Sequence, residues 1–118
     1  MIACSRDNGL WTVTLNRPDK ANSLTAEMLS RLADIAMEAT VDPHIKALIL
    51  TGAGDKVFSA GADLDEARAG LAPSPLWEQV SGAIAALPCL TVAALNGTLA
   101  GGAFGMALAC DLRIAVPD

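Results

Sequence analysis

The chain has 118 residues, of which 53% are hydrophobic and 18% charged, so it has the size and composition of one globular domain rather than of a disordered segment. The formal net charge of −5 and the scattered positions of its eight Lys and Arg residues exclude the basic stripe of a nucleic-acid-binding protein. Three well-separated cysteines without a CxxC pair indicate free thiols in a reducing, cytoplasmic compartment and no metal site.

Strand and helix patterns alternate along the first half of the chain. Residues 10–15, LWTVTL, are predicted to form a strand, and the DNG tripeptide before them indicates a hairpin turn. After a loop over residues 16–24, Thr25 is expected to cap a helix that runs to about Thr40. Glu27 and Arg31 are expected to pair on the solvent-exposed side of this helix. The next strand, KALILT at residues 46–51, is apolar enough to be buried on both faces.

The second half repeats this alternation. A loop with several glycines leads to a short helix near Asp63, and later helices are expected at residues 76–87 and 101–110. Strands are expected at residues 90–95 and 112–116. The segment ALILTGAG…SAGADLDEA resembles TVAALNGTLAGGAFGMA, so a strand–loop–helix unit recurs. We therefore expect one α/β domain over residues 1–118, with largely parallel strands.

The uncharged stretch from Gln79 to Cys110 is longer than the roughly 20 residues of a membrane-spanning helix. Pro88, Asn96 and Gly97 divide it, so we interpret it as a helix, a strand, a turn and a buried helix, with no membrane partner expected. The N-terminal segment lacks a long apolar run and does not predict a signal peptide.

Two of the predicted strands end in a glycine-rich turn that leads into a helix. The first residues of a helix leave backbone N–H groups unpaired, and these can bind an anion without any side chain. The sequence contains no GxGxxG motif, and Ala103 and Phe104 stand where a P-loop needs Lys and Ser or Thr. Two interpretations stay open: a backbone oxyanion site, or glycines that only allow a helix to pack closely on the sheet.

Three segments, VTLNRPDKANSLTAEML, ALILTGAGDKVFSAGADLDE and VAALNGTLAGGAFGMALACDLRIA, resemble the crotonase (enoyl-CoA hydratase/isomerase) superfamily in order and spacing. The resemblance covers nearly the whole chain and implies a crotonase-type α/β spiral of ββα units, here truncated to the N-terminal half of that fold. It also implies a lyase or isomerase of fatty acid metabolism that acts on a coenzyme A thioester, has no covalently bound cofactor, and assembles as a homotrimer or hexamer.

The same resemblance implies a set of site residues. Backbone N–H groups of Ala62 and Gly102 would form an oxyanion hole for a thioester enolate. Substrate would contact five further residues: Lys20 and Ala21 on the loop that receives the CoA nucleotide, and Asp63, Leu64 and Asp65 along the thioester channel. A solvated loop explains Lys20 equally well, and carboxylates at a helix start explain Asp63 and Asp65.

The sequence departs from the family at the position of the hydratase glutamate, which is Gly105 here. The family's second acidic residue lies beyond the matched segments. His44 is expected to be solvated, and Asp111 to orient the turn into the last strand. Isomerisation is therefore favoured over hydration, with a non-catalytic CoA-binding or assembly module as the alternative and a mononucleotide-binding βαβ domain as a weaker one.

Overall fold

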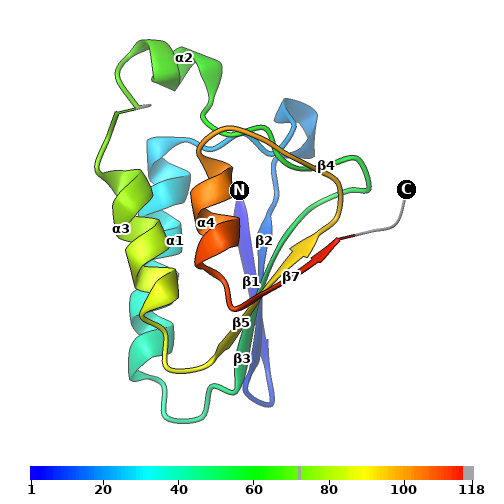
Figure 1. The fold of residues 1–118 in the computed structure, drawn as a ribbon, viewed down its shortest axis with the longest axis vertical. Coiled ribbons are helices and arrows are strands. Elements are labelled where there is room, and N and C mark those ends of the chain that lie inside the picture. Colours follow the sequence, from blue (N-terminus) through cyan, green and yellow to red (C-terminus); the bar gives the residue numbers. More distant parts are fainter. Residues whose placement is uncertain (72, 116–118) are drawn as a thin grey trace.

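A computed structural model describes residues 1–71 and 73–115 of the chain. Its strands form a five-stranded sheet and a separate two-stranded sheet (Figure 1). The strands are β1 (Ile2–Asp7), β2 (Leu10–Leu15), β3 (Ala47–Gly52), β4 (Val57–Ser59), β5 (Leu90–Leu95), β6 (Thr98–Leu99) and β7 (Leu112–Ala115). The helices are α1 (Ala26–Val41), α2 (Leu64–Arg68), α3 (Leu76–Ala85) and α4 (Ala103–Ala109), with a 3-10 turn at Pro18–Lys20.

The larger sheet has the strand order β1-β2-β3-β5-β7. Only β1 and β2 are antiparallel, and the turn between them contains Asn8 and Gly9 with φ of 52° and 85°. Two consecutive residues with positive φ form the turn whose twist matches a hairpin, so the hairpin predicted from DNG is confirmed. The pairs β2–β3, β3–β5 and β5–β7 are parallel, as the alternating pattern predicted.

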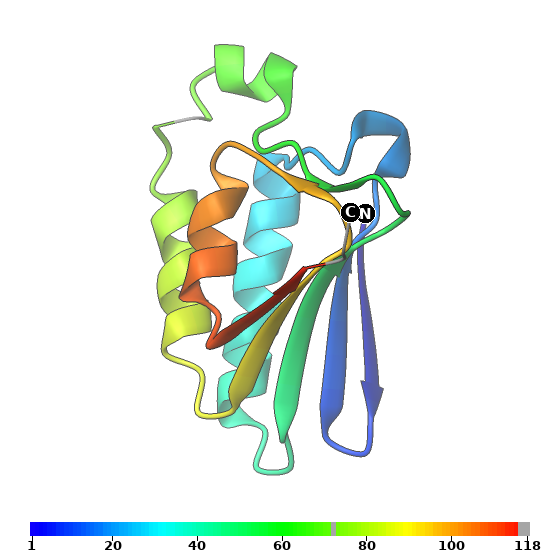
Figure 2. The ribbon, with the colours of Figure 1, turned by 45° about the vertical axis from the view of Figure 1, so that its right-hand side comes forward.

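The helices α1, α3 and α4 cover one face of the five-stranded sheet, and α3 packs against both of the others (Figures 1 and 2). Thr25 caps α1 as predicted, because its hydroxyl accepts a hydrogen bond from Met28 N at 3.1 Å. The core lies between the helices and this face of the sheet. Its largest fully buried side chains include Phe58, Leu15, Leu29, Ile35 and Leu50.

The prediction that residues 46–51 are buried on both faces is wrong for the described chain. Leu48 and Leu50 point under the helices and are buried, whereas Ile49 on the opposite face is only partly buried. All three longer helices lie on the same face of the sheet, so no helix of the described residues covers the opposite face (Figure 2). An apolar run shows that a strand can be buried, but it does not show which face receives a partner.

Three further local expectations need correction. Arg31 pairs with Glu38 at 3.3 Å instead of with Glu27. The helix α4 begins at Ala103 rather than at Gly101, because Gly101 has a left-handed φ of 62°. The helix predicted over residues 76–87 ends at Ala85. The strand predicted over residues 112–116 is present to Ala115, and Val116 lies outside the described residues.

The predicted repeat is a pair of ββα units. The first consists of β3, β4 and α2, and the second of β5, β6 and α4. The units stack in parallel, since β3 pairs with β5 and β4 pairs with β6. This arrangement confirms the expected α/β spiral. Within residues 1–71 and 73–115, no helix has the length and apolar character needed to cross a bilayer.

Candidate functional site

The two glycine turns touch each other above the ends of β4 and β6. Both Gly61 and Gly101 have positive φ, 95° and 62°, which favours glycine. A Cβ on Gly61 would lie 3.1 Å from the Gly101 Cα and 3.1 Å from the Ala100 oxygen. The parallel β4–β6 pair holds the turns together, and Ala100 N donates to Ser59 O at 3.0 Å. The structure therefore brings together two turns that are far apart in the sequence.

The two turns carry the backbone N–H groups of Ala62 and Gly102. Within the described part of the chain, neither group donates to a protein acceptor. Two nearby N–H groups are occupied, since Asp63 N donates to Leu24 O at 2.9 Å and Phe104 N donates to Gly101 O at 3.2 Å. Two unpaired donors on touching turns can bind one oxyanion. The resemblance implied these two donors, and their binding of an oxyanion stays a prediction.

A hollow of about 410 Å³ lies beside the first turn. This volume is within the usual range for small-molecule sites. Its lining contains Ala62 and all five predicted substrate contacts, and adds three residues that the sequence did not single out. The lining consists of Lys20, Ala21, Ser23, Ala60, Ala62, Asp63, Leu64, Asp65 and Arg68. Gly102 does not line the hollow, and neither do the two glycines, Gly61 and Gly101, through which the turns touch.

The loop before α1 is held in place by Asn22, which the sequence analysis missed. Asn22 is buried and has a left-handed φ of 52°. Its side chain accepts from Arg17 N at 2.9 Å and donates to the carbonyl oxygens of Ala53 and Val57 at 3.0 and 2.9 Å. Asparagine adopts positive φ more readily than most residues and is frequent in turns, which was the available signal.

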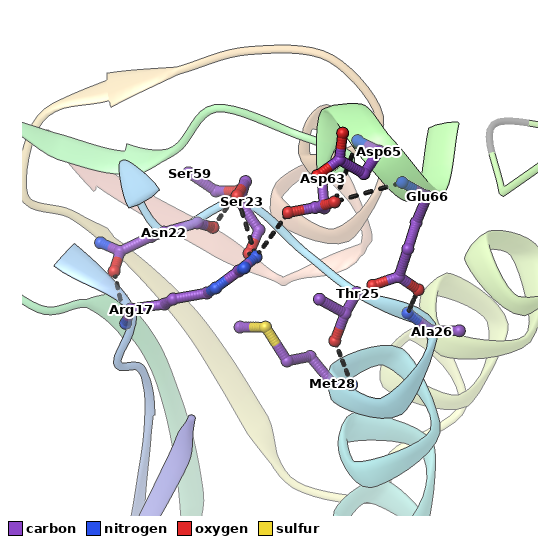
Figure 3. Close-up of polar contacts among 10 residues, drawn as sticks. All are labelled: Arg17, Asn22, Ser23, Thr25, Ala26, Met28, Ser59, Asp63, Asp65 and Glu66. Atoms are coloured by element: carbon purple, nitrogen blue, oxygen red, sulfur yellow. Dashed lines mark hydrogen bonds and ion pairs between the residues drawn. The ribbon is translucent and has the colours of Figure 1, made fainter. Parts of the chain in front are cut away.

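Asp63 joins this loop to the first glycine turn (Figure 3). Its carboxylate accepts from Arg17 at 2.9 Å and from the backbone N–H groups of Asp65 and Glu66 at 3.1 and 3.2 Å. Hydrogen bonding from Glu66 N, and then from Arg17, lowers the pKa of Asp63 below its ordinary value. The expected role of Asp63 at a helix start is confirmed, whereas its contact with substrate stays a prediction.

Gly105 lies on α4, one turn beyond Gly102, and is exposed. A Cβ there would meet only Ser81 Oγ, at 3.2 Å, so this side chain alone would have to shift by a few tenths of an ångström. Gly102 is confined instead, because a Cβ would lie 2.9 Å from the Trp77 ring. Trp77 is fixed by a hydrogen bond from its indole N–H to Leu71 O at 3.0 Å. Sequence reasoning missed Trp77, since no pattern connects it to Gly102.

The remaining titratable candidates lie away from the glycine turns. His44 is exposed and precedes β3, so it lies at the opposite edge of the sheet from the turns. Thr91 N donates to the Asp111 carboxylate at 3.0 Å, and Asp111 N donates to Thr91 Oγ1 at 2.9 Å. These bonds confirm the expected role of Asp111 in orienting the turn before β7. Cys4, Cys89 and Cys110 are free thiols. In residues 1–71 and 73–115, no three His, Cys, Asp or Glu side chains gather to hold a metal ion.

Comparisons with known proteins identify relatives of this chain. The model of the enoyl-CoA hydratase/isomerase family matches residues 5–117. YngF of Bacillus subtilis, named for that family, is 48% identical over 109 residues, which are 87% of this chain and 42% of YngF. The (E)-benzylidenesuccinyl-CoA hydratase of Thauera aromatica is 36% identical over 123 residues, covering 92% of this chain and 44% of its own length.

Solved structures show the same relationship. An enoyl-CoA hydratase from Bacillus anthracis superimposes with a TM-score of 0.88 at 36% identity, and the match covers 97% of this chain and 46% of that one. The chain thus spans less than half the length of these relatives.

Proposed function

The chain belongs to the enoyl-CoA hydratase/isomerase (crotonase) family, and on that premise we propose that the protein binds an acyl-CoA thioester and stabilises its enolate. The thioester oxygen would lie between the backbone N–H groups of Ala62 and Gly102. The CoA moiety would occupy the hollow lined by Lys20, Ala21 and the segment Asp63–Asp65. The substrate is the thioester itself, and the proposal requires no metal and no covalently bound cofactor.

The observation that carries this proposal is the contact between the two glycine turns. It brings the turn that carries Gly102 against the turn that carries Ala62, which lines a hollow of ligand size, and neither N–H group has a protein acceptor among the described residues. A donor aimed at developing negative charge is worth about 3–4 kcal/mol of activation free energy. Backbone donors need close approach of the ligand and no reactive side chain, which explains the small residues around Gly102.

The reaction class that this site favours is isomerisation of an enoyl thioester. Hydration requires a held water, a base that activates it, and an acid that protonates the α carbon. Gly105 supplies none of these groups, and Ser81 is the only side chain that reaches toward its missing Cβ within the described residues. The Thauera relative is named a hydratase, so hydration and isomerisation should be measured side by side.

A non-catalytic CoA-binding or assembly module is the second candidate. Two carboxylates line the hollow, and that of Asp63 is already engaged by Arg17 and two backbone N–H groups. A carboxylate in such contacts is a poor general base. Binding of acyl-CoA without turnover of any enoyl-CoA would favour this candidate.

The experiment that tests the oxyanion hole compares Gly102→Pro with Gly102→Ala in the full-length protein. Both variants add a Cβ that meets the Trp77 ring, but only proline removes the N–H. We expect Gly102→Pro to lower turnover by about 10²–10³-fold relative to Gly102→Ala. Equal turnover in the two variants, with matching circular dichroism spectra, would show that Gly102 N–H is not a donor.

We further propose a homotrimer or hexamer in the reducing cytoplasm, active in fatty acid metabolism. Exposed apolar side chains are compatible with assembly, because either a neighbouring subunit or the rest of the full-length protein would cover them. These include Phe104, Leu108, Leu112 and Ile114, which are between 49% and 63% exposed. Three free cysteines support a reducing compartment. Light scattering on the full-length protein tests assembly, and a monodisperse monomer would contradict it.

A further inference from the structure

We propose that the Arg17–Asp63 ion pair is a positioning device that aims the backbone N–H of Ala62 at the ligand. This inference rests on the function proposed above. It assigns to Arg17, which directly precedes the 3-10 turn at Pro18–Lys20, a role in the oxyanion hole although its side chain does not line the hollow. Asp63 acts in this proposal through the backbone that it holds.

The peptide of Ala62 is fixed on both sides by one residue of the neighbouring loop. Leu24 N donates to Gly61 O at 2.7 Å, and Asp63 N donates to Leu24 O at 2.9 Å. These two bonds form an isolated parallel bridge between Leu24 and Ala62. The direction of the Ala62 N–H therefore depends on how firmly the segment around Leu24 is held against the first glycine turn.

Arg17 is the side chain that spans this junction (Figure 3). One of its terminal nitrogens lies 2.9 Å from the Asp63 carboxylate, 3.3 Å from Ser23 O and 3.2 Å from Ser23 Oγ. Its backbone N–H also donates to the side chain of Asn22 at 2.9 Å. Arg17 thus contacts both sides of the bridge, with Asn22 and Ser23 on one side and Asp63 on the other.

The Arg17–Asp63 ion pair is sufficiently shielded from solvent to contribute to the stability of this segment. The Arg17 and Asp63 side chains are 19% and 15% exposed, whereas both partners of the Arg31–Glu38 pair are 47% exposed. Exposed pairs contribute little because water and salt screen them, and a shielded charge that loses its partner is costly. Removal of Arg17 would leave the Asp63 carboxylate without its counter-charge and loosen the segment that orients Ala62.

The consequence is a specific loss in the transition state. Oxyanion donors stabilise the enolate more than the ground-state thioester, so a misdirected donor lowers kcat and leaves KM nearly unchanged. Displacement of a catalytic group by about 1 Å can cost about 10²-fold in rate. We therefore expect Arg17→Met to lower kcat by about ten- to a hundredfold.

The test uses the full-length protein and a saturated acyl-CoA that carries ¹³C at its thioester carbonyl. Hydrogen bonds to this carbonyl lower its stretching frequency, which infrared difference spectroscopy measures directly. In the parent we expect a clear downshift on binding. In Arg17→Met we expect a smaller downshift and a lower kcat, with partial recovery in Arg17→Lys. Arg31→Gln, which breaks the exposed pair with Glu38, is the matched control and should behave like the parent.

The outcomes separate this inference from the proposed function. A parent that binds acyl-CoA without any downshift contradicts the oxyanion hole itself. A parental downshift and kcat in Arg17→Met contradict the positioning role alone. A raised KM with unchanged kcat also contradicts it, because Arg17 would then serve ligand binding. If Arg17→Met does not fold, Arg17→Lys and Asp63→Asn test the proposal instead. A parental downshift and a parental kcat in both variants overturn the proposal. A smaller downshift together with a lower kcat in Asp63→Asn supports it.

Discussion

Substitution of Gly105 by glutamate tests the reaction class, and the structure predicts that the fold accepts it. Gly105 is helical, and a Cβ there would meet only Ser81 Oγ, at 3.2 Å. The Ser81 side chain is half-buried and needs to move by only a few tenths of an ångström. Replacement of glycine by alanine inside a helix stabilises the fold by about 0.5–1 kcal/mol. We therefore expect Gly105→Glu to unfold in urea within about 1 kcal/mol of the parent.

The chemical effect is expected to be larger. Gly105 follows Gly102 by three residues, so their positions lie on the same side of the helix start. A carboxylate placed there could hold and activate water beside the oxyanion donors. A general base contributes about 10²–10⁴-fold, which corresponds to about 3–5 kcal/mol of activation free energy. This gain requires a second acid that protonates the α carbon elsewhere in the full-length protein.

The assay follows hydration of crotonyl-CoA through loss of the enoyl-thioester absorbance, with 3-enoyl to 2-enoyl isomerisation measured in parallel. Gly105→Gln is the matched control, since it has the same size but no basic oxygen. We expect slow hydration by the parent and a gain in Gly105→Glu that Gly105→Gln does not share. Rapid hydration by the parent, or equal gains in both variants, would refute the reasoning that Gly105 limits water activation.

Three other expectations concern the fold and its titration. Gly97→Ala should destabilise the fold by about 3 kcal/mol in urea unfolding, because its Cβ would overlap backbone atoms of Lys56 and lie 2.7 Å from Val57 N. The control Gly82→Ala has open space and should not destabilise. The folded state lowers the pKa of Asp63, so the ionised carboxylate stabilises the fold above the unfolded-state pKa near 3.8, and this stabilisation is lost as pH falls through the lower folded-state pKa. Asp63→Asn should therefore make the free energy of unfolding depend less on pH below about pH 4. Burial, and to a smaller extent the charge of Asp111, raises the pKa of the buried Cys110 thiol to about 11. Maleimide at pH 8 should therefore label Cys4 and Cys89 in the folded protein and react with Cys110 only after unfolding, which mass spectrometry measures. Labelling of native Cys110 at an equal rate would contradict its burial.

Local patterns predicted the elements that have enough residues to show a period. The strand LWTVTL has the predicted bounds, because alternating side chains repeat over its whole length. The recurring strand–loop–helix unit predicted the α/β architecture with parallel strands, whereas the spiral of ββα units was implied by the family resemblance. The strands β4 and β6 were missed because three and two residues inside glycine loops are too short for any periodicity. Their pairing is nevertheless what brings the two glycine turns together.

The site itself was only partly accessible from the sequence. Ala62 and Gly102 were named through a family resemblance, and the sequence could not show that their turns touch. The Arg17–Asp63 pair joins residues 46 positions apart, which no local pattern relates. Burial of β3 on both faces was expected from its apolar residues and is wrong here, because the side on which helices pack is decided by the chain's topology rather than by strand composition.

If the proposed function holds, the contact between Gly61 and Gly101 would also link ligand binding to cooperative folding. The two proposed donors belong to different ββα units, so neither unit alone contains a complete oxyanion hole. A partly unfolded chain that has lost the β4–β6 pairing would separate the donors and lose affinity for the enolate. A ligand that requires both donors therefore binds only the state in which the two units are packed together. Its binding free energy then stabilises that packed state relative to the separated one. Substrate bound to both proposed donors would then protect this junction against local opening.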